Sequence, residues 1–254
     1  MREVAAEDEH RYFEAELPTS GVPIDYLFVL AGGKRVGRGG QALRADVVEL
    51  LRRPPPGWQD AVVYTILVDR FRRGGNDGAW DKTATLDERA PHLGDLRGVR
   101  EALPYLAALG VTVLHLSPVA DSDSAHRYDA KNPLVVDPRL GGEAELRDLI
   151  ADAHDLGLRV LCDVVLTHVH RDFLPFCDVR LRGNESPYAS WFFIERHPFL
   201  EGEGPGYRHY QKGQWQEPLL NTDCQAVADY LGRVLRQYLA LGVDGFRLDA
   251  AADV

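Results

Sequence analysis

The chain has 254 residues, of which 45% are hydrophobic and 27% charged, an ordinary composition for a globular protein. This length allows one large domain or two modest ones. The formal charge of −10 argues against nucleic acid as a partner, because binding a polyphosphate requires a basic surface. No run approaches the ~18 apolar residues of a membrane span, so we also expect no membrane partner.

The first ten residues are charged and lack the apolar stretch of a secretory signal. The three cysteines, Cys162, Cys177 and Cys224, are odd in number and lack metal-type spacing. They are typical of free thiols in a reducing compartment. We therefore expect a cytoplasmic protein.

Residues 1–53 have the features of a small β unit. Short runs rich in strand formers occupy residues 12–17 and 24–30, with turn signals between and after them. Three consecutive prolines then open a linker at residues 54–60. We expect this linker to separate the β unit from a second domain, residues 61–254.

The second domain alternates strands with helices. Continuous apolar runs, expected of buried parallel strands, occupy residues 61–68, 111–116, 158–165 and 243–248. Helices are expected within 98–109, over 143–156, and from a capping box at 222–225 to residue 241. The last two are expected to carry apolar stripes: Leu146, Leu149, Ile150, Ala153 and Leu156 on the first of them, and Val227, Leu231, Val234, Tyr238 and Leu241 on the second. This alternation predicts an α/β fold with right-handed crossovers and a parallel sheet. The long connection at about 169–221 is expected to be a small inserted domain.

Polar side chains follow each predicted strand, where the active groups of such sheets gather. They are Asp69 and Arg70, Ser117 with the loop 121–129, residues 163–168, and Arg247 with Asp249. A carboxylate, an imidazole, an aromatic ring and a guanidinium at one edge suit sugar chemistry. The ring can stack on a pyranose, and the carboxylate can attack an anomeric carbon.

The exact sequences of these segments are a more specific signal than their residue types. Residues 163–168 read DVVLTH and resemble the strand-three motif DVVxNH of the α-amylase family of glycoside hydrolases. Residues 245–250 read GFRLDA and match its strand-four motif GFRxDA. Residues 126–129 read HRYD and, with Val136-Asp137-Pro138 and Gly141, resemble a loop of its neopullulanase, cyclomaltodextrinase and maltogenic-amylase branch. The resemblance covers residues 58–254 in register.

The resemblance implies a (β/α)8 TIM barrel that stops after its fourth strand in this chain. Residues 61–254 would be the first half of that barrel, including the inserted domain at about 169–221. Residues 1–53 would be the tail of the branch's N-terminal β-sandwich.

The resemblance also implies roles for single residues. Asp249 matches the nucleophile that forms a covalent glycosyl-enzyme, and Arg247 matches the arginine that holds it ionised. His168 matches a histidine that binds a substrate hydroxyl, and Tyr128 a tyrosine that stacks on the same sugar. Two further positions, Asp163 and His126, are supporting candidates, together with Asp129; Asp163 either orders its loop or touches the substrate.

Several positions depart from the family pattern. Thr167 replaces the usual Asn that in many members ligates calcium, and a hydroxyl is a poorer ligand than an amide oxygen. Asn76 and Asp77 lie where some members bind another calcium, but the sequence there favours a flexible turn. Ala252 and Asp253 stand where many α-amylases have Lys-His, which argues against a standard endo-α-amylase. Because the first calcium position has a poorer ligand and the second favours a flexible turn, we expect no required cofactor.

A retaining glycosidase needs a second carboxyl group about 5–5.5 Å from its nucleophile. In the family that acid/base is a Glu after strand five, and no residue up to Val254 matches it. We therefore expect a fragment of a glycosidase acting on α-glucan or maltooligosaccharides, with little turnover of its own. The alternatives are a non-catalytic carbohydrate-binding relative, or a family isomerase or sucrose-active enzyme; the oligomeric state stays open.

Overall fold

The computed structural model describes residues 58–75 and 91–251, together with six short strands between Arg2 and Arg44. The chain divides into two compact units, residues 1–60 and 61–254. In the first unit the strands pair antiparallel: β1 (Arg2–Glu7) with β2 (His10–Glu14), β3 (Asp25–Tyr26) with β6 (Leu43–Arg44), and β4 (Phe28–Val29) with β5 (Arg35–Val36). Whether they belong to a sandwich stays a prediction.

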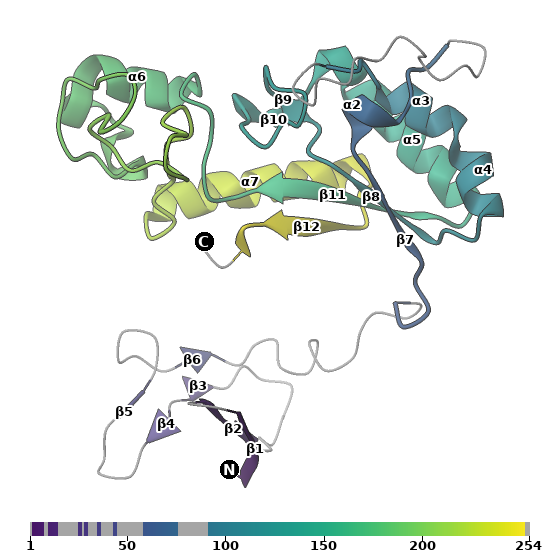
Figure 1. Ribbon diagram of the computed structural model, residues 1–254, viewed down its shortest axis with the longest axis horizontal. Helices are drawn as coiled ribbons and strands as arrows, with labels where there is room; N and C mark the ends of the chain where they lie inside the picture. The colour runs from purple at the N-terminus through teal and green to yellow at the C-terminus, as the bar shows by residue number, and fades with distance from the viewer. Residues whose placement is uncertain are drawn as a thin grey trace. The chain divides into compact units, whose positions relative to one another are not determined.

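The second unit is built on a parallel sheet of four strands in the order β7-β8-β11-β12 (Figure 1). These strands are β7 (Val63–Ile66), β8 (Val113–Leu116), β11 (Arg159–Val165) and β12 (Gly245–Asp249). They fall within or next to the four predicted apolar runs. The two central strands are largely buried, whereas the outer strands β7 and β12 carry exposed apolar side chains such as Val63 and Leu248.

Helices fill the connections between these strands, as the alternation predicted. They are α2 (Val68–Phe71), α3 (Leu96–Glu101), α4 (Leu103–Ala108), α5 (Gly142–Asp155), α6 (Leu174–Arg182) and α7 (Gln225–Leu241). Figure 1 shows α7 alongside β11 and β12, and α3, α4 and α5 gathered together. None of the helices in the described part of the chain is long and apolar enough to cross a membrane.

Two helix boundaries differ from the prediction. The expected single helix within 98–109 is two helices, and Pro104 lies in the first turn of α4, where its missing N–H removes no helical hydrogen bond. The capping box at 222–225 was wrong, because α7 begins at Gln225 and Cys224 caps it without a side-chain hydrogen bond. The residues before the helix form a turn instead, in which Cys224 N–H donates to the Asn221 carbonyl at 3.0 Å.

The core lies between the helices and one face of the sheet. The predicted stripe of α7 is buried: Val227, Leu231, Val234, Tyr238 and Leu241. So is that of α5: Leu146, Leu149, Ile150 and Ala153. These side chains form one hydrophobic cluster with strand residues such as Leu116 and Cys162. Leu156, predicted on the α5 stripe, is exposed because the helix ends at Asp155.

The connection between β11 and α7 adds aromatic side chains to the same hydrophobic cluster. It contains α6 and the 3-10 helices η3 (Gly183–Glu185) and η4 (Ala189–Trp191). Phe176 of α6 lies with ring centroids 4.8 Å from both Phe192 and Tyr207. We call residues 166–224 the inserted segment; it belongs to the same compact unit as the sheet.

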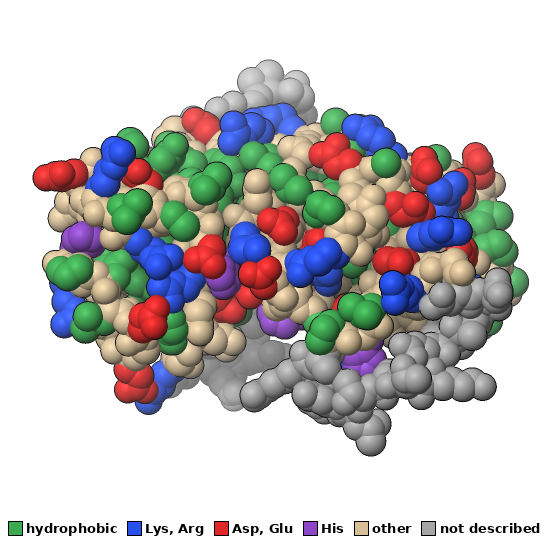
Figure 2. Space-filling view, turned by 90° about the horizontal axis from the view of Figure 1, so that it is seen from above, with side chains coloured by type: hydrophobic (Ala, Val, Ile, Leu, Met, Phe, Trp, Pro, Cys, Tyr) green, Lys and Arg blue, Asp and Glu red, His purple; other side chains and the backbone are tan. Residues whose placement is uncertain are grey.

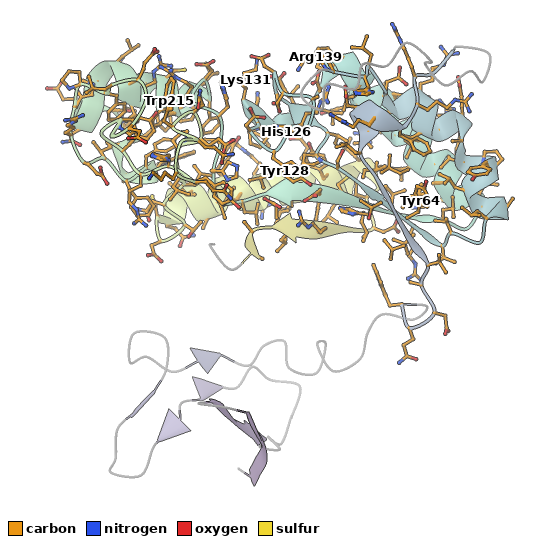
Figure 3. All side chains as sticks on the ribbon, viewed as in Figure 1. Tyr64, His126, Tyr128, Lys131, Arg139 and Trp215 are labelled. Atoms are coloured by element: carbon orange, nitrogen blue, oxygen red, sulfur yellow. The ribbon has the colours of Figure 1, made fainter. Side chains whose placement is uncertain are left out.

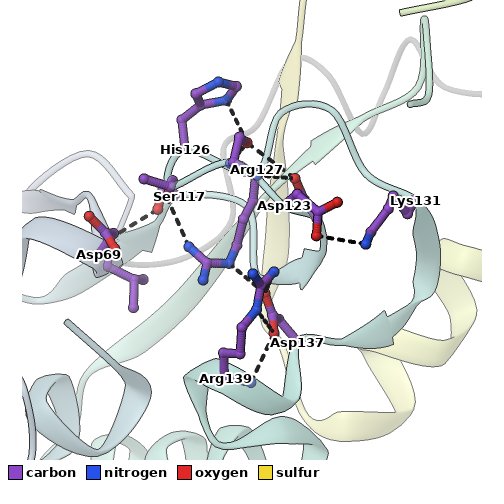
Figure 4. Close-up of polar contacts among 12 residues, drawn as sticks. Asp69, Ser117, Asp123, His126, Arg127, Lys131, Asp137 and Arg139 are labelled. Carbon is purple, nitrogen blue, oxygen red and sulfur yellow. Dashed lines mark hydrogen bonds and ion pairs between the residues drawn. The ribbon is translucent and has the colours of Figure 1, made fainter. Parts of the chain in front are cut away.

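The loop between β8 and α5 carries the antiparallel pair β9 (Ala120–Asp121) and β10 (Asn132–Val136), then the 3-10 helix η2 (Pro138–Leu140). Its support is a buried carboxylate, Asp137, which accepts hydrogen bonds from Arg127 Nε at 3.0 Å and from Arg139 Nη2 at 2.8 Å (Figure 4). Burial raises the pKa of Asp137, but the two guanidinium groups outweigh it and hold the pKa below its ordinary value. Arg127 has a φ of +61°, which an L-residue adopts only when its surroundings impose it.

A core prediction uses two leucines of the same helix. Replacing buried Leu231 by Ala should lower the free energy of unfolding by about 2–5 kcal/mol, because it removes buried methyl groups and leaves a cavity. The matched control Leu239→Ala changes a half-exposed residue of α7 and should stay within about 0.5 kcal/mol. Urea unfolding measures both values. Equal losses would contradict the packing described for α7.

A second prediction concerns the loop support. Asp137→Ala leaves the buried guanidinium of Arg127 without its carboxylate, which should cost about 3–5 kcal/mol. The control is Asp123→Ala, which breaks the exposed 2.7 Å pair with Lys131 and should cost about 0–1 kcal/mol. Denaturant unfolding compares them. A loss from Asp123→Ala as large as that from Asp137→Ala would show that burial is not what makes the pair important.

Candidate active site

The site lies at the carboxyl ends of β11 and β12. In their parallel register Asp163 is opposite Arg247, and Val165 is opposite Asp249. Because side chains alternate between the two faces of a strand, Asp163, Arg247 and Asp249 share one face. The strand pairing therefore brings together three residues that were predicted from separate motifs.

Arg247 joins the two carboxylates. Its Nη1 donates to Asp249 Oδ1 at 2.6 Å and to the two oxygens of Asp163 at 3.0 and 3.1 Å. Hydrogen bonds to Asp163 and Asp249 raise the pKa of Arg247 above its ordinary value, so the guanidinium is charged at any physiological pH. Asp163 is buried, whereas the side chain of Asp249 is 18% exposed. Of the two carboxylates, only Asp249 is accessible to a ligand.

Tyr128 completes this group from the β8–α5 loop. Its hydroxyl donates to Asp163 Oδ2 at 2.7 Å. Burial, and then the hydrogen bond to Asp163, raise the pKa of Tyr128 above its ordinary value. His126 stacks on Tyr128 with ring centroids 5.9 Å apart and stays half exposed (Figure 3). The predicted aromatic platform is therefore next to the predicted carboxylates.

The neighbouring Asp129 supports the same loop. It accepts hydrogen bonds from the hydroxyls of Ser122 and Ser124. Together with the Asp137 pairs, these contacts fix the backbone on which His126 and Tyr128 sit.

Sequence reasoning missed His115, which lies within the apolar run of β8. Its Nδ1 is 3.1 Å from Thr65 Oγ1, and its Nε2 is 3.5 Å from Asp163 Oδ2. The contacts around Asp163 thus extend to β8 and β7. One signal in the sequence could have identified His115. It is a polar residue within an apolar strand, and a buried polar side chain requires a polar partner.

His168 is close to the site but is enclosed by protein. Only 2% of its side chain is exposed, and its ring stacks on Tyr210 with centroids 4.3 Å apart. Nδ1 lies 2.8 Å from Thr167 Oγ1, and Nε2 lies 3.8 Å from Glu217 Oε2. Burial lowers the pKa of His168 to about 4, although the charges of Asp249 and Asp129 act in the opposite direction. The imidazole is therefore neutral at neutral pH.

Other polar residues at the strand ends hold loops. Asp69 is buried and accepts hydrogen bonds from the backbone N–H groups of His92 and Leu93. Ser117 Oγ accepts a hydrogen bond from the backbone of Val68 at 3.1 Å. The face seen from above carries acidic and basic side chains side by side (Figure 2).

The calcium candidates Asn76 and Asp77 lie outside the described residues. Within residues 58–75 and 91–251 no group of three or more His, Cys, Asp or Glu side chains could hold a metal ion. The hydroxyl of Thr167, at the third position where the sequence raised the question of calcium, contacts His168.

The chain is similar to known proteins over most of its length. The family described as "Alpha amylase, catalytic domain" matches residues 65–254. Neopullulanase 2 of Thermoactinomyces vulgaris is 34% identical over 98% of this chain and 46% of its own length. A cyclomaltodextrinase of a Bacillus species is 35% identical over 79% of this chain and 37% of its own.

Among solved structures, the cyclic α-maltosyl-(1→6)-maltose hydrolase of Arthrobacter globiformis superposes with a TM-score of 0.72 and 30% identity. The match covers 79% of this chain and 46% of that protein. The chain therefore spans less than half the length of these relatives. With the family matching most of the second unit, the chain belongs to the α-amylase family of glycoside hydrolases, whose catalytic domain is a (β/α)8 barrel.

Proposed function

We propose that this chain is part of a retaining glycosidase or transglycosylase acting on α-glucosidic bonds, with Asp249 as its nucleophile. The observation that carries the proposal is the position of Arg247 between buried Asp163 and accessible Asp249. A carboxylate held in place by a guanidinium, next to an aromatic ring at the ends of parallel strands, suits attack on a sugar.

The chemistry follows from these contacts. Arg247 holds Oδ1 of Asp249, which leaves Oδ2 to attack the anomeric carbon. The bond from carbon to Oδ2 forms as the glycosidic bond breaks, and the departing oxygen takes a proton from a general acid. Water, or a second sugar hydroxyl, then attacks the same carbon and releases the carboxylate. Tyr128 lies where it can stack on the sugar, and Asp163 positions both Tyr128 and Arg247.

The general acid is not assigned within the described residues. Asp163 is the carboxylate nearest to Asp249 in this network, but Tyr128 and Arg247 both donate to it, so it is held as an acceptor. Loss of general acid catalysis typically costs about 10²–10⁴-fold in rate.

The substrate class is part of the proposal. The relatives' names refer to pullulan, cyclomaltodextrins and a cyclic maltosyl-maltose, so we propose a maltooligosaccharide, pullulan or cyclodextrin substrate with the linkage left open. We also propose that the sheet of four strands is the first half of the barrel, that residues 1–53 belong to a β-sandwich, and that no calcium is required. The three free cysteines support a cytoplasmic location.

The nucleophile can be tested without the general acid. A fluorinated α-glucosyl fluoride loses fluoride unaided, so the 254-residue chain should become covalently labelled on the peptide that contains Asp249. Mass spectrometry after proteolysis identifies the position, and Asp249→Asn should abolish the label. Labelling at another carboxylate would contradict the assignment. Maltooligosaccharide binding without any label would favour the non-catalytic relative.

A turnover assay tests whether this chain contains a general acid. The same chain should release little or no reducing sugar from maltodextrin, pullulan or cyclodextrin, because none of the described residues is assigned as the general acid for the departing oxygen. The labelled chain is the control that its nucleophile is accessible. Robust turnover that Asp249→Asn abolishes would show that the acid/base lies within these residues.

A further inference from the structure

Glu217 is an acidic residue close to the site that no motif of the sequence singled out. It lies at the end of the inserted segment, where short backbone bridges pair His168 with Leu219 and His209 with Pro218. The backbone N–H of Tyr210 donates to the Glu217 carbonyl at 3.0 Å. The backbone of Glu217 is therefore fixed against the strand end that carries His168.

The side chain of Glu217 points toward His168 and is the more accessible of the two. Glu217 Oε2 lies 3.8 Å from His168 Nε2, which is beyond hydrogen-bonding distance. The carboxyl group is therefore not hydrogen-bonded to the imidazole. The exposed fraction of the Glu217 side chain is 13%, against 2% for His168. Thr167 contacts the other ring nitrogen of His168, and Tyr210 covers a ring face.

We propose that Glu217 is a further substrate-binding residue of this site, and that its carboxyl group binds a hydroxyl of the α-glucosyl unit. This inference rests on the proposed function. It adds a residue from the inserted segment to a site otherwise built from strand ends and the β8–α5 loop.

The electrostatics around Glu217 favour a neutral carboxyl group. Burial, and then the negative charge of Asp129, raise the pKa of Glu217 to about 7. The charged and titratable groups that act on the neighbouring His168 are Asp249, Asp129 and His126. Two of these are carboxylates, so an uncharged Glu217 avoids a third negative charge beside them.

A neutral carboxyl group suits a sugar hydroxyl. It can donate one hydrogen bond and accept another, whereas a carboxylate only accepts. Between about pH 4 and pH 7, Glu217 is protonated and His168 is not, because their pKa values are about 7 and about 4. Affinity that depends on this donated hydrogen bond should fall as the pH rises through 7.

The test is maltotriose binding by the whole 254-residue chain, measured by isothermal titration calorimetry from pH 5.5 to 8.5. Glu217→Leu should weaken binding by up to about tenfold at pH 6, because the sugar hydroxyl loses its partner. Glu217→Gln keeps an uncharged donor and acceptor, so it should bind within about threefold of the original chain and lose the fall in affinity above pH 7. Glu201→Gln, an exposed residue of the same segment, is the matched control and should change nothing.

The outcomes separate the two proposals. A folded chain that does not bind maltotriose overturns the proposed function, and the inference with it. Binding that is the same in the Glu217→Leu variant overturns the inference alone. If circular dichroism shows that Glu217→Leu is unfolded, the Glu217→Gln variant is used instead. A pH dependence of its maltotriose affinity identical to that of the original chain overturns the inference, and loss of that pH dependence supports it.

Discussion

The site depends on the ion pair between Arg247 and buried Asp163. A carboxylate removed from water is costly unless charged or hydrogen-bonding partners surround it, and Asp163 receives them from β12 and from the loop that carries Tyr128. Because the same guanidinium also holds Asp249, the requirement to neutralise one buried charge fixes the direction of the accessible one. Structural stability and the placement of the proposed nucleophile thus arise from the same contacts.

The β8–α5 loop repeats this arrangement at a second carboxylate. Asp137 is fully buried, and Arg127 and Arg139 both donate to it. Arg127 occupies a left-handed backbone conformation to do so, and Tyr128 follows it directly. The strain at Arg127 and its buried ion pair therefore determine where the ring of Tyr128 lies relative to Asp163.

The inserted segment determines the surroundings of His168. It covers His168 with Tyr210 and places Glu217 beside it. The same burial lowers the pKa of the imidazole and raises that of the carboxyl group, since both are driven toward their uncharged forms. Between about pH 4 and pH 7 both groups are therefore uncharged, which suits an uncharged sugar.

Alternating strands and helices predicted the parallel sheet, and the motifs at the strand ends predicted that Asp163, Arg247 and Asp249 lie together, because parallel strands end at the same edge of a sheet. The sequence also located Tyr128, through a local motif, and the buried stripe of α7, through helical periodicity. No sequence pattern predicted that α7 begins at Gln225, that His115 lies next to Asp163, or that His168 is enclosed beside Glu217. The contacts of His115 with Asp163 and of His168 with Glu217 join residues about 50 positions apart, and burial and the resulting pKa values are properties of such contacts, which no local pattern encodes.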